Sequence, residues 1–262
     1  MDLGPASPSE RPRTATVLPT HKLLWTYAFL AANALLWLAM SLSGGSENLA
    51  VLVRFGAKYN PLIVQGQYWR FVAPVFLHIG FLHLALNSYA LLIFGRDVER
   101  LFGRWRFLAL YALAGVSGSV ASFVGNDAIS AGASGAIFGL VGAMVTYLFT
   151  YRENLGMWGR QRLTNLLLVV GLNLLWGFAG PGIDNLGHIG GLLAGLLLGW
   201  AYCPRYRAVA PLVPSEPTRL VDVFSSWRAW LASGALLGAL TLLATVGIAH
   251  WTVVYRGVAN SL

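Results

Sequence analysis

Charged residues are scarce in this chain. Asp, Glu, Lys and Arg make up 11% of its 262 residues, whereas 56% of the residues are hydrophobic. A soluble domain has about 25% charged residues, and the mean hydropathy of this chain is +0.63. The composition therefore excludes an ordinary soluble domain. From the length we expect one membrane-embedded unit and not a membrane anchor joined to a large soluble enzyme.

Cysteine is almost absent as well. A single Cys203 excludes an intrachain disulfide and a cysteine-based metal cluster, so we interpret it as a small packing residue at a helix end. The sequence has no metal or nucleotide motif, and we expect no metal and no cofactor. The net charge of +8 is typical of a topology signal on a membrane protein, so we expect no nucleic-acid partner.

Long apolar runs, by contrast, are abundant. We interpret seven of them as membrane helices, because they are continuous and lack the alternating pattern of barrel strands. The fifth is shorter than the roughly 20 residues that span a bilayer, so we expect it to be tilted or incompletely embedded. The predicted helices are Leu23–Leu42, Phe81–Phe94 extended backward by Phe71–Leu77, Phe107–Val124, Ala131–Thr150, Leu163–Ala179, Leu186–Tyr202 and Ala229–Tyr255.

The basic residues predict how these helices are oriented. Fourteen of the 18 Lys and Arg residues lie in one set of connections, and four lie in the opposite set. Basic connections stay on the cytosolic side of a membrane. We therefore expect a multi-pass protein of the cell membrane with its N-terminus in the cytosol and its C-terminus outside. The fold class is predicted as all-α, a polytopic membrane helix bundle.

Four polar residues fall on the second, fourth and sixth predicted helices, which all run from outside to inside. His83 and Asn87, Ser134, and His188 each lie one to two turns from the outer end of their helix, or roughly 5–10 Å below the surface. Polar groups in hydrocarbon are costly unless they are hydrogen-bonded, and they mark functional sites by default. Their common depth predicts a single site.

These residue types fit nucleophilic attack on an amide. A serine hydroxyl such as that of Ser134 needs a base, and an imidazole such as that of His188 is the usual base near neutral pH. The carbonyl oxygen becomes negative during the attack and needs donors. The Ser134 amide, the His83 ring and the Asn87 amide are candidates. Gly132 and Gly135 allow the backbone to approach closely at the helix entry.

Taken in order, these motifs make the chain resemble the rhomboid family of intramembrane serine proteases from Leu23 to Tyr202. The motifs that carry the resemblance are Trp69-Arg70, His78 with His83 and Asn87, Gly95-x3-Glu99-x3-Gly103, Gly132-Ala133-Ser134-Gly135, and Gly187-His188-x2-Gly191.

The resemblance implies a six-helix core with an additional seventh C-terminal helix. It implies that Ser134 is the nucleophile, that His188 is the general base, and that His83, Asn87 and the Ser134 amide line the oxyanion hole. Phe138 would pack its ring on the catalytic imidazole, where the family commonly has Tyr. The expected units are a flexible cytosolic tail (1–22), the catalytic core (23–203), a cytosolic linker (204–228), the extra helix (229–255) and an outer tail (256–262).

The implied substrates are single-span or multi-span membrane proteins of the bilayer. Such a substrate would enter sideways from the lipid, past the fifth helix and the loop Gly177–Asp184. We infer no oligomeric state. Two rival functions are a catalytically silent rhomboid relative, which would usually lack the serine or the histidine, and a small transporter. A transporter predicts midplane charges and paired broken helices, and the sequence has neither.

Several residues have more than one interpretation. Gly115-Val116-Ser117-Gly118 repeats the Gly-x-Ser-Gly pattern, but we place it about two turns deeper than His188 and expect a close helix contact there. Asp184 is either the third member of a triad or the cap of the following helix. His78 is either catalytic or a residue that shapes its loop.

Three further expectations concern packing. Arg70 and Glu99 are expected to tie loops and helix ends together by hydrogen bonds. Gly191-x3-Gly195-x3-Gly199 is expected to face Gly135-x3-Gly139, because glycine stripes let membrane helices approach closely. That contact would bring Ser134 within hydrogen-bond reach of His188.

Overall fold

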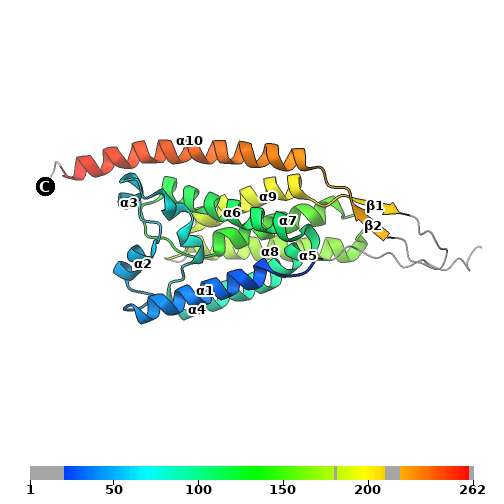
Figure 1. The fold of residues 1–262 in the computed structure, drawn as a ribbon, viewed down its shortest axis with the longest axis horizontal. Coiled ribbons are helices and arrows are strands. Elements are labelled where there is room, and N and C mark those ends of the chain that lie inside the picture. The colour runs from blue at the N-terminus through cyan, green and yellow to red at the C-terminus, as the bar shows by residue number, and fades with distance from the viewer. Residues whose placement is uncertain (1–20, 180–181, 210–218, 260–262) are drawn as a thin grey trace, which may run out of the picture.

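The computed structural model describes residues 21–179, 182–209 and 219–259. In these residues the chain is a bundle of helices that run roughly along one axis (Figure 1), and the predicted all-α helix bundle is confirmed. One exception is a pair of short antiparallel strands, β1 (Tyr206–Val209) and β2 (Arg219–Asp222), within the predicted linker. Most of the predicted flexible tail, at residues 1–20, lies outside the described residues.

Among the described residues, three helices are long and apolar enough to cross a membrane by length and composition, and α7 is a shorter apolar helix. The three are α1 (Trp25–Leu42), α6 (Arg104–Gly125) and α10 (Ser226–Ala259). The other long helices are α4 (Gly80–Ala90), α7 (Ser134–Thr150), α8 (Gly156–Ala179) and α9 (Asn185–Tyr202).

The predicted backward extension of the second span, Phe71–Leu77, is wrong. This stretch forms two 3₁₀ turns, η2 (Tyr68–Phe71) and η3 (Ala73–Phe76), and Leu77 is extended with φ −97° and ψ 146°. Pro74 lacks the N–H that a continuous helix needs, and α4 begins only at Gly80. Before these turns the connection from α1 contains two short helices, α2 (Leu49–Phe55) and α3 (Asn60–Val64).

Beyond Ala90 the same helix continues without a break. It passes through a π-helical segment, η4 (Leu91–Gly95), into α5 (Arg96–Phe102). Single π segments inside α-helices are frequent at functional sites. Here the segment begins about two turns after His83 and one turn after Asn87.

The fifth predicted helix is longer than expected. The apolar run Leu163–Ala179 predicted a short element, but α8 has 24 residues and is therefore about 36 Å long. Its first turns contain Arg160, Gln161 and Arg162, which are good helix formers although they are polar. Hydropathy marked only the apolar part of the helix and missed these turns.

Helices α6, α7 and α9 form the closely packed centre of the bundle. The additional helix α10 lies along α6 and α9 (Figure 1). Its Trp251 indole donates to the Phe123 carbonyl of α6 at 2.7 Å, and its Ser233 hydroxyl lies 2.7 Å from the Tyr202 hydroxyl of α9. Cys203 is buried at the C-terminal end of α9, as predicted for a packing residue.

Glu99 and Arg70 tie separate segments together, as predicted. The Glu99 carboxylate accepts from the backbone N–H groups of Leu24, Trp25 and Thr26 at 2.8–2.9 Å, so it caps the otherwise unpaired start of α1. The Arg70 guanidinium is buried and donates to the carbonyls of Val53 at 2.8 Å and Ala57 at 2.9 Å. Both charges therefore satisfy backbone groups between elements.

Candidate functional site

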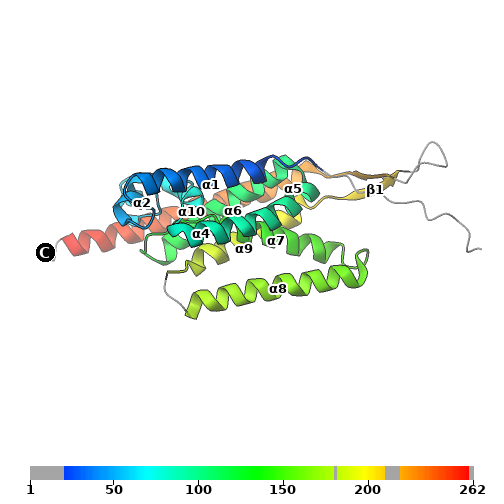
Figure 2. The same ribbon diagram turned by 90° about the horizontal axis from the view of Figure 1, so that it is seen from below.

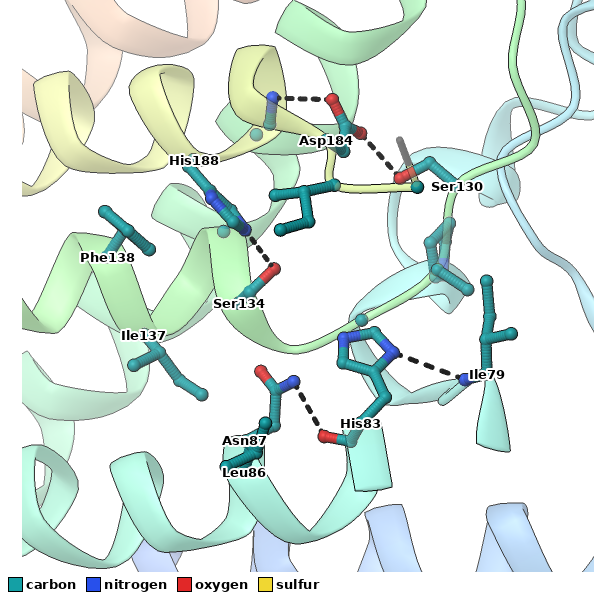
Figure 3. A pocket seen from close by; sticks show the side chains of 18 of the residues that line it. Ile79, His83, Leu86, Asn87, Ser130, Ser134, Ile137, Phe138, Asp184 and His188 are labelled. Atoms are coloured by element: carbon teal, nitrogen blue, oxygen red, sulfur yellow. Dashed lines mark hydrogen bonds between the residues drawn. The ribbon is translucent and has the colours of Figure 1, made fainter. Parts of the chain in front are cut away.

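A cavity of about 680 Å³ lies between α4, α7, α8 and α9. Ser134, His188, His83 and Asn87, the four polar residues that the sequence placed at one depth, all line it (Figure 3). Their helices come from different parts of the chain, and the fold brings the four side chains to one end of the bundle. The remaining lining is mostly apolar, and it includes residues of α4 and α8 such as Leu82, Leu86 and Trp176.

Ser134 and His188 are in hydrogen-bond contact. Ser134 is the first residue of α7, and its Oγ lies 2.9 Å from Nε2 of His188 (Figure 3). His188 is in the first turn of α9, and its backbone N–H donates to the Asp184 carbonyl at 3.1 Å. Because both side chains leave the first turn of a helix, the close approach of α7 and α9 allows them to meet.

The predicted glycine contact produces this approach. A Cβ atom at Gly191 would lie 1.9 Å from the Gly135 carbonyl oxygen, and one at Gly195 would lie 2.1 Å from the Gly139 carbonyl oxygen. A Cβ atom at Gly199 would lie 2.5 Å from the Cα of Ala143. No side chain fits between these backbones, so any larger residue would push α9 away from α7.

The His188 ring stacks on Phe138. The two ring centroids are 4.4 Å apart with an interplanar angle of 10°. Phe138 lies one turn after Ser134 on α7, so the same helix that carries the hydroxyl also supports the imidazole. Stacking fixes the plane of the ring and leaves Nε2 aimed at the serine.

The Asp184 carboxylate accepts no hydrogen bond from the imidazole of His188. The Nδ1 atom of His188 is buried and has no hydrogen-bond partner among the described residues. Instead, the Asp184 carboxylate accepts from the Gly187 N–H at 3.0 Å and from the Ser130 hydroxyl at 2.6 Å. Of the two interpretations left open by the sequence, the geometry supports a helix cap and gives no support to a triad.

His83 and Gly132 lie next to the serine. A Cβ atom at Gly132 would lie 2.8 Å from Cε1 and 3.0 Å from Nε2 of His83, so only glycine lets the backbone pass this ring. Nδ1 of His83 accepts from the Ile79 N–H at 3.4 Å. A neutral imidazole that accepts at one nitrogen carries its proton on the other. Nε2 is therefore the donor of His83, on the side of Gly132 and Ser134.

Asn87 lies one turn after His83 on α4. Its amide nitrogen donates to the His83 carbonyl at 3.0 Å (Figure 3). An amide has two N–H groups, so the second remains for a partner in the cavity. His83 and Asn87 thus face the same space from one helix.

His78 supports the site without reaching the serine. It is fully buried, its Nε2 accepts from the Ala133 N–H at 3.5 Å, and its ring lies edge-on to His83 with centroids 5.3 Å apart. Its contacts hold the segment before Ser134 and the ring of His83. They fit the loop-shaping interpretation of His78.

The predicted depth of the second Gly-x-Ser-Gly sequence is wrong. A Cβ at Gly118 would lie 2.7 Å from the Gly187 carbonyl and 3.3 Å from the Gly135 Cα, so this motif lies level with the motifs that contain Ser134 and His188. The Ser117 hydroxyl is nevertheless bound to the Leu113 carbonyl of its own helix at 2.7 Å. The predicted close helix contact is present, because Gly190 of α9 lies against the Ser117 carbonyl and Ala121.

Sequence reasoning missed Ser130 and Lys58. Lys58 is fully buried, and its amine donates to the Asn126 carbonyl at 3.0 Å and side chain at 3.2 Å, beyond the C-terminus of α6. Burial lowers the pKa of Lys58 to about 8, although Asp184 and Asp127 oppose the shift. A lysine in a short loop is an ordinary surface residue by sequence, so no local signal predicted its burial.

Comparisons with known proteins agree with these motifs. Residues 65–205 match the family model described as the rhomboid domain. The rhomboid protease GluP of Bacillus subtilis (strain 168) is 47% identical over 186 residues, which cover 71% of this chain and 36% of that protein. RHOMBOID-like protein 5 of Arabidopsis thaliana is 39% identical over 171 residues, covering 63% of this chain and 54% of that protein.

A third relative is matched over most of its length. The putative rhomboid protease YdcA of Bacillus subtilis (strain 168) is 36% identical over 171 residues, which cover 64% of this chain and 83% of that protein. The chain therefore spans about a third to a half of the first two relatives and most of the third.

Proposed function

The chain belongs to the rhomboid family, and from this premise we propose that it is a serine endopeptidase that hydrolyses peptide bonds in or next to transmembrane helices. Family membership and its apolar helices make it a multi-pass membrane protein. Relatives carry the names rhomboid protease and rhomboid-type serine protease. The proposal rests above all on one observation, the 2.9 Å contact between Ser134 Oγ and His188 Nε2.

In the proposed reaction His188 acts as the general base. Nε2 takes the proton of Ser134 while Oγ attacks the substrate carbonyl, and it then gives that proton to the leaving amine. Water hydrolyses the resulting acyl-enzyme with the same histidine as base. When Nε2 accepts, Nδ1 carries the other proton of the neutral ring, and Asp184 is occupied by the helix cap. We therefore propose a Ser134–His188 dyad.

The attacked carbonyl oxygen becomes an oxyanion, and the proposed donors surround the place where it would form. They are the Ser134 N–H at the start of α7, the Nε2–H of His83 and the free N–H of Asn87. The first turn of a helix has unpaired N–H groups and a positive dipole end, which favour negative charge. Removing one such donor commonly costs about 10²–10³ in kcat.

The proposed substrate is a single-span or multi-span membrane protein. It would enter the cavity sideways, past α8 and the loop Gly177–Asp184, of which residues 180–181 lie outside the described part. Asn173 and Trp176 of α8 line the cavity opposite Leu82 and Leu86 of α4, so a segment arriving there meets both helices. A helical substrate hides its carbonyls in hydrogen bonds, so segments with Gly or Pro near the site should be preferred.

The basic residues support the proposed orientation. Arg-rich connections at the end with β1 and β2 would face the cytosol, and the cavity end with α2 and α3 would face outward. We place the protein in the cell membrane with its N-terminus in the cytosol and its C-terminus outside.

The decisive experiment compares serine variants in detergent-purified protein with a tagged single-span substrate. Ser134→Ala and His188→Ala should each lower cleavage by about 10³-fold or more, because the loss of one group of a catalytic unit leaves the remaining groups without effect. Ser117→Ala is the matched control: it removes the serine of the second Gly-x-Ser-Gly and should leave cleavage unchanged. Persisting cleavage in both Ser134→Ala and His188→Ala would refute the assignment.

A further inference from the structure

A hydrogen bond joins the two loops that precede the catalytic helices. Ser130 lies four residues before Ser134 in the loop between α6 and α7, and Asp184 lies four residues before His188 at the start of α9. The Ser130 hydroxyl donates to Oδ2 of Asp184 at 2.6 Å (Figure 3). A hydroxyl bound to a carboxylate makes a short, charge-assisted hydrogen bond, about twice as strong as a neutral one.

On the α9 side the carboxylate is held rigidly relative to His188. Oδ1 of Asp184 accepts from the Gly187 N–H at 3.0 Å, and the Asp184 backbone carbonyl accepts from the His188 N–H at 3.1 Å. Two groups of one residue, Oδ1 and the backbone carbonyl, are thereby fixed to the first turn of the helix. A displacement of Asp184 would move the turn that carries the imidazole.

On the α7 side Ser130 is held equally firmly. Its backbone exchanges two hydrogen bonds with Lys58, with N···O distances of 2.8 and 3.1 Å. Two residues later, the Gly132 N–H donates to the Pro74 carbonyl at 2.9 Å. The segment that leads to Ser134 is therefore held by hydrogen bonds to the connection between α1 and α4, in addition to its bond with Asp184.

The contact between α7 and α9 does not by itself fix how far one helix is shifted along the other. Its closest approaches are glycines against backbone carbonyls, and such van der Waals contacts have little directional preference. The Thr146 hydroxyl of α7 also donates to the Leu196 carbonyl of α9 at 3.3 Å, but this bond lies about three turns after Ser134. A hydrogen bond weakens steeply when its angle or length changes. The Ser130–Asp184 bond supplies this directional restraint at the end of the helices where the catalytic side chains are.

We propose that Ser130 and Asp184 are positioning residues that set the register between Ser134 and His188. Neither side chain bonds to the imidazole or to the catalytic hydroxyl, so both act through the start of α9 and the loop before α7. The inference rests on the proposed function, because it concerns the geometry of that same dyad.

The test is a set of variants at the two positions, assayed for kcat and KM with a single-span substrate. Ser130→Ala leaves the helix cap intact and should lower kcat by about tenfold with little change in KM, because a misplacement near 1 Å can cost up to about a hundredfold. Asp184→Ala should lower kcat at least as much. The double Ala variant should be no worse than Asp184→Ala, because both changes remove one shared bond.

Exchange of the two residues separates positioning from a general loss of structure. Ser130→Asp alone places two carboxylates side by side and should give the lowest kcat. Combined with Asp184→Ser, it restores a hydroxyl–carboxylate pair and keeps a good helix cap, so kcat should return to within about threefold of wild type. Ser41→Ala on α1, whose hydroxyl bonds only within its own helix, is the matched control and should leave kcat unchanged.

The outcomes distinguish the two proposals. A wild-type protein that cleaves no substrate would overturn the proposed function. A wild type that cleaves, with Ser130→Ala at the wild-type kcat or with an exchanged pair no better than Ser130→Asp, would overturn only the positioning role. Thermal unfolding of each variant is measured in parallel. If Asp184→Ala does not fold, Ser130→Ala and the exchanged pair decide the question.

Discussion

The interface between α7 and α9 is packed backbone against backbone, whereas α8 has few close neighbours. At the interface, Gly191 and Gly195 press against backbone carbonyls, with no room for a Cβ atom. On α8, Gly171 has no neighbour within 4 Å of a Cβ position, and Leu172 and Trp176 are exposed. Figure 2 shows α8 along the edge of the bundle.

The proposed reaction has two requirements, and each of these two regions meets one of them. Ser134 and His188 must stay within hydrogen-bond distance, and backbone-to-backbone contact allows the least movement between the helices that carry them. A substrate segment must reach the same cavity from the lipid, and a helix with few close neighbours opposes its passage least. In this proposal α7 and α9 fix the distance between Ser134 and His188, and α8 allows the substrate to enter.

The largest expected effect comes from the same substitution in the two regions. Gly195→Leu should lower cleavage by more than about a hundredfold, because a side chain there forces α9 away from the Gly139 carbonyl and breaks the dyad geometry. Gly171→Leu on α8 should leave cleavage within about twofold of wild type, since its Cβ position is open. Substrate turnover and thermal unfolding of both variants are compared. Unaltered turnover in Gly195→Leu would refute the role of the glycine contact.

A second prediction concerns Lys58, which binds Asn126 at the C-terminal end of α6. Its pKa is lowered to about 8 in the folded protein by burial, whereas an unfolded lysine has a pKa of about 10.4. Below pH 8 both states are protonated, and the residue adds no pH dependence. Between about pH 8 and about pH 10.4 the unfolded chain binds more protons than the folded protein. The free energy of unfolding should therefore rise with pH by up to roughly 3 kcal/mol over this range.

Lys58→Met should abolish this rise. Thermal unfolding in detergent at about pH 8 and about pH 10 measures it, and the exposed Lys22→Met serves as the matched control. If wild type and Lys58→Met respond to pH alike, the lysine is not desolvated in the folded protein.

The smallest effect distinguishes two aromatic residues that line the same cavity. Phe138→Leu removes the ring stacked on His188 and should lower kcat by about two- to tenfold, which corresponds to an aromatic pair of about 0.5–1.5 kcal/mol. Phe138→Tyr keeps the ring and should retain kcat. Trp176→Leu on α8 should change KM more than kcat, because in the proposed reaction that side chain would meet the entering substrate and not the Ser134–His188 pair. Equal changes in kcat for Phe138→Leu and Trp176→Leu would remove the distinction between the two regions.

Hydropathy and motif order revealed much of this molecule in advance. Continuous apolar runs predicted the long helices, and a shared depth on three parallel helices predicted that Ser134, His188, His83 and Asn87 line one cavity. Both signals are local: a helix has a fixed rise per residue, so distance from its end follows directly from sequence position. The contact between the glycine stripes was also predictable from the sequence, because a four-residue spacing places small residues on one face of a helix.

Other features were decided only by how the elements lie against one another. The predicted depth of Ser117 was wrong because the shift of α6 along α9 cannot be predicted from the sequence of either helix. The polar first turns of α8 and the break at Pro74 escaped a prediction based on apolar runs alone. Asp184 had two interpretations by spacing, triad member or helix cap, and only the folded geometry showed that its carboxylate binds the Gly187 N–H and the Ser130 hydroxyl.

The sequence by itself thus determined which residues carry the proposed chemistry and on which helices they lie, because periodicity and hydrophobicity act over a few turns. The tertiary structure decided the separations between those residues. These depend on crossing, shift and loop contacts between segments far apart in the chain, and no short stretch of sequence contains that information.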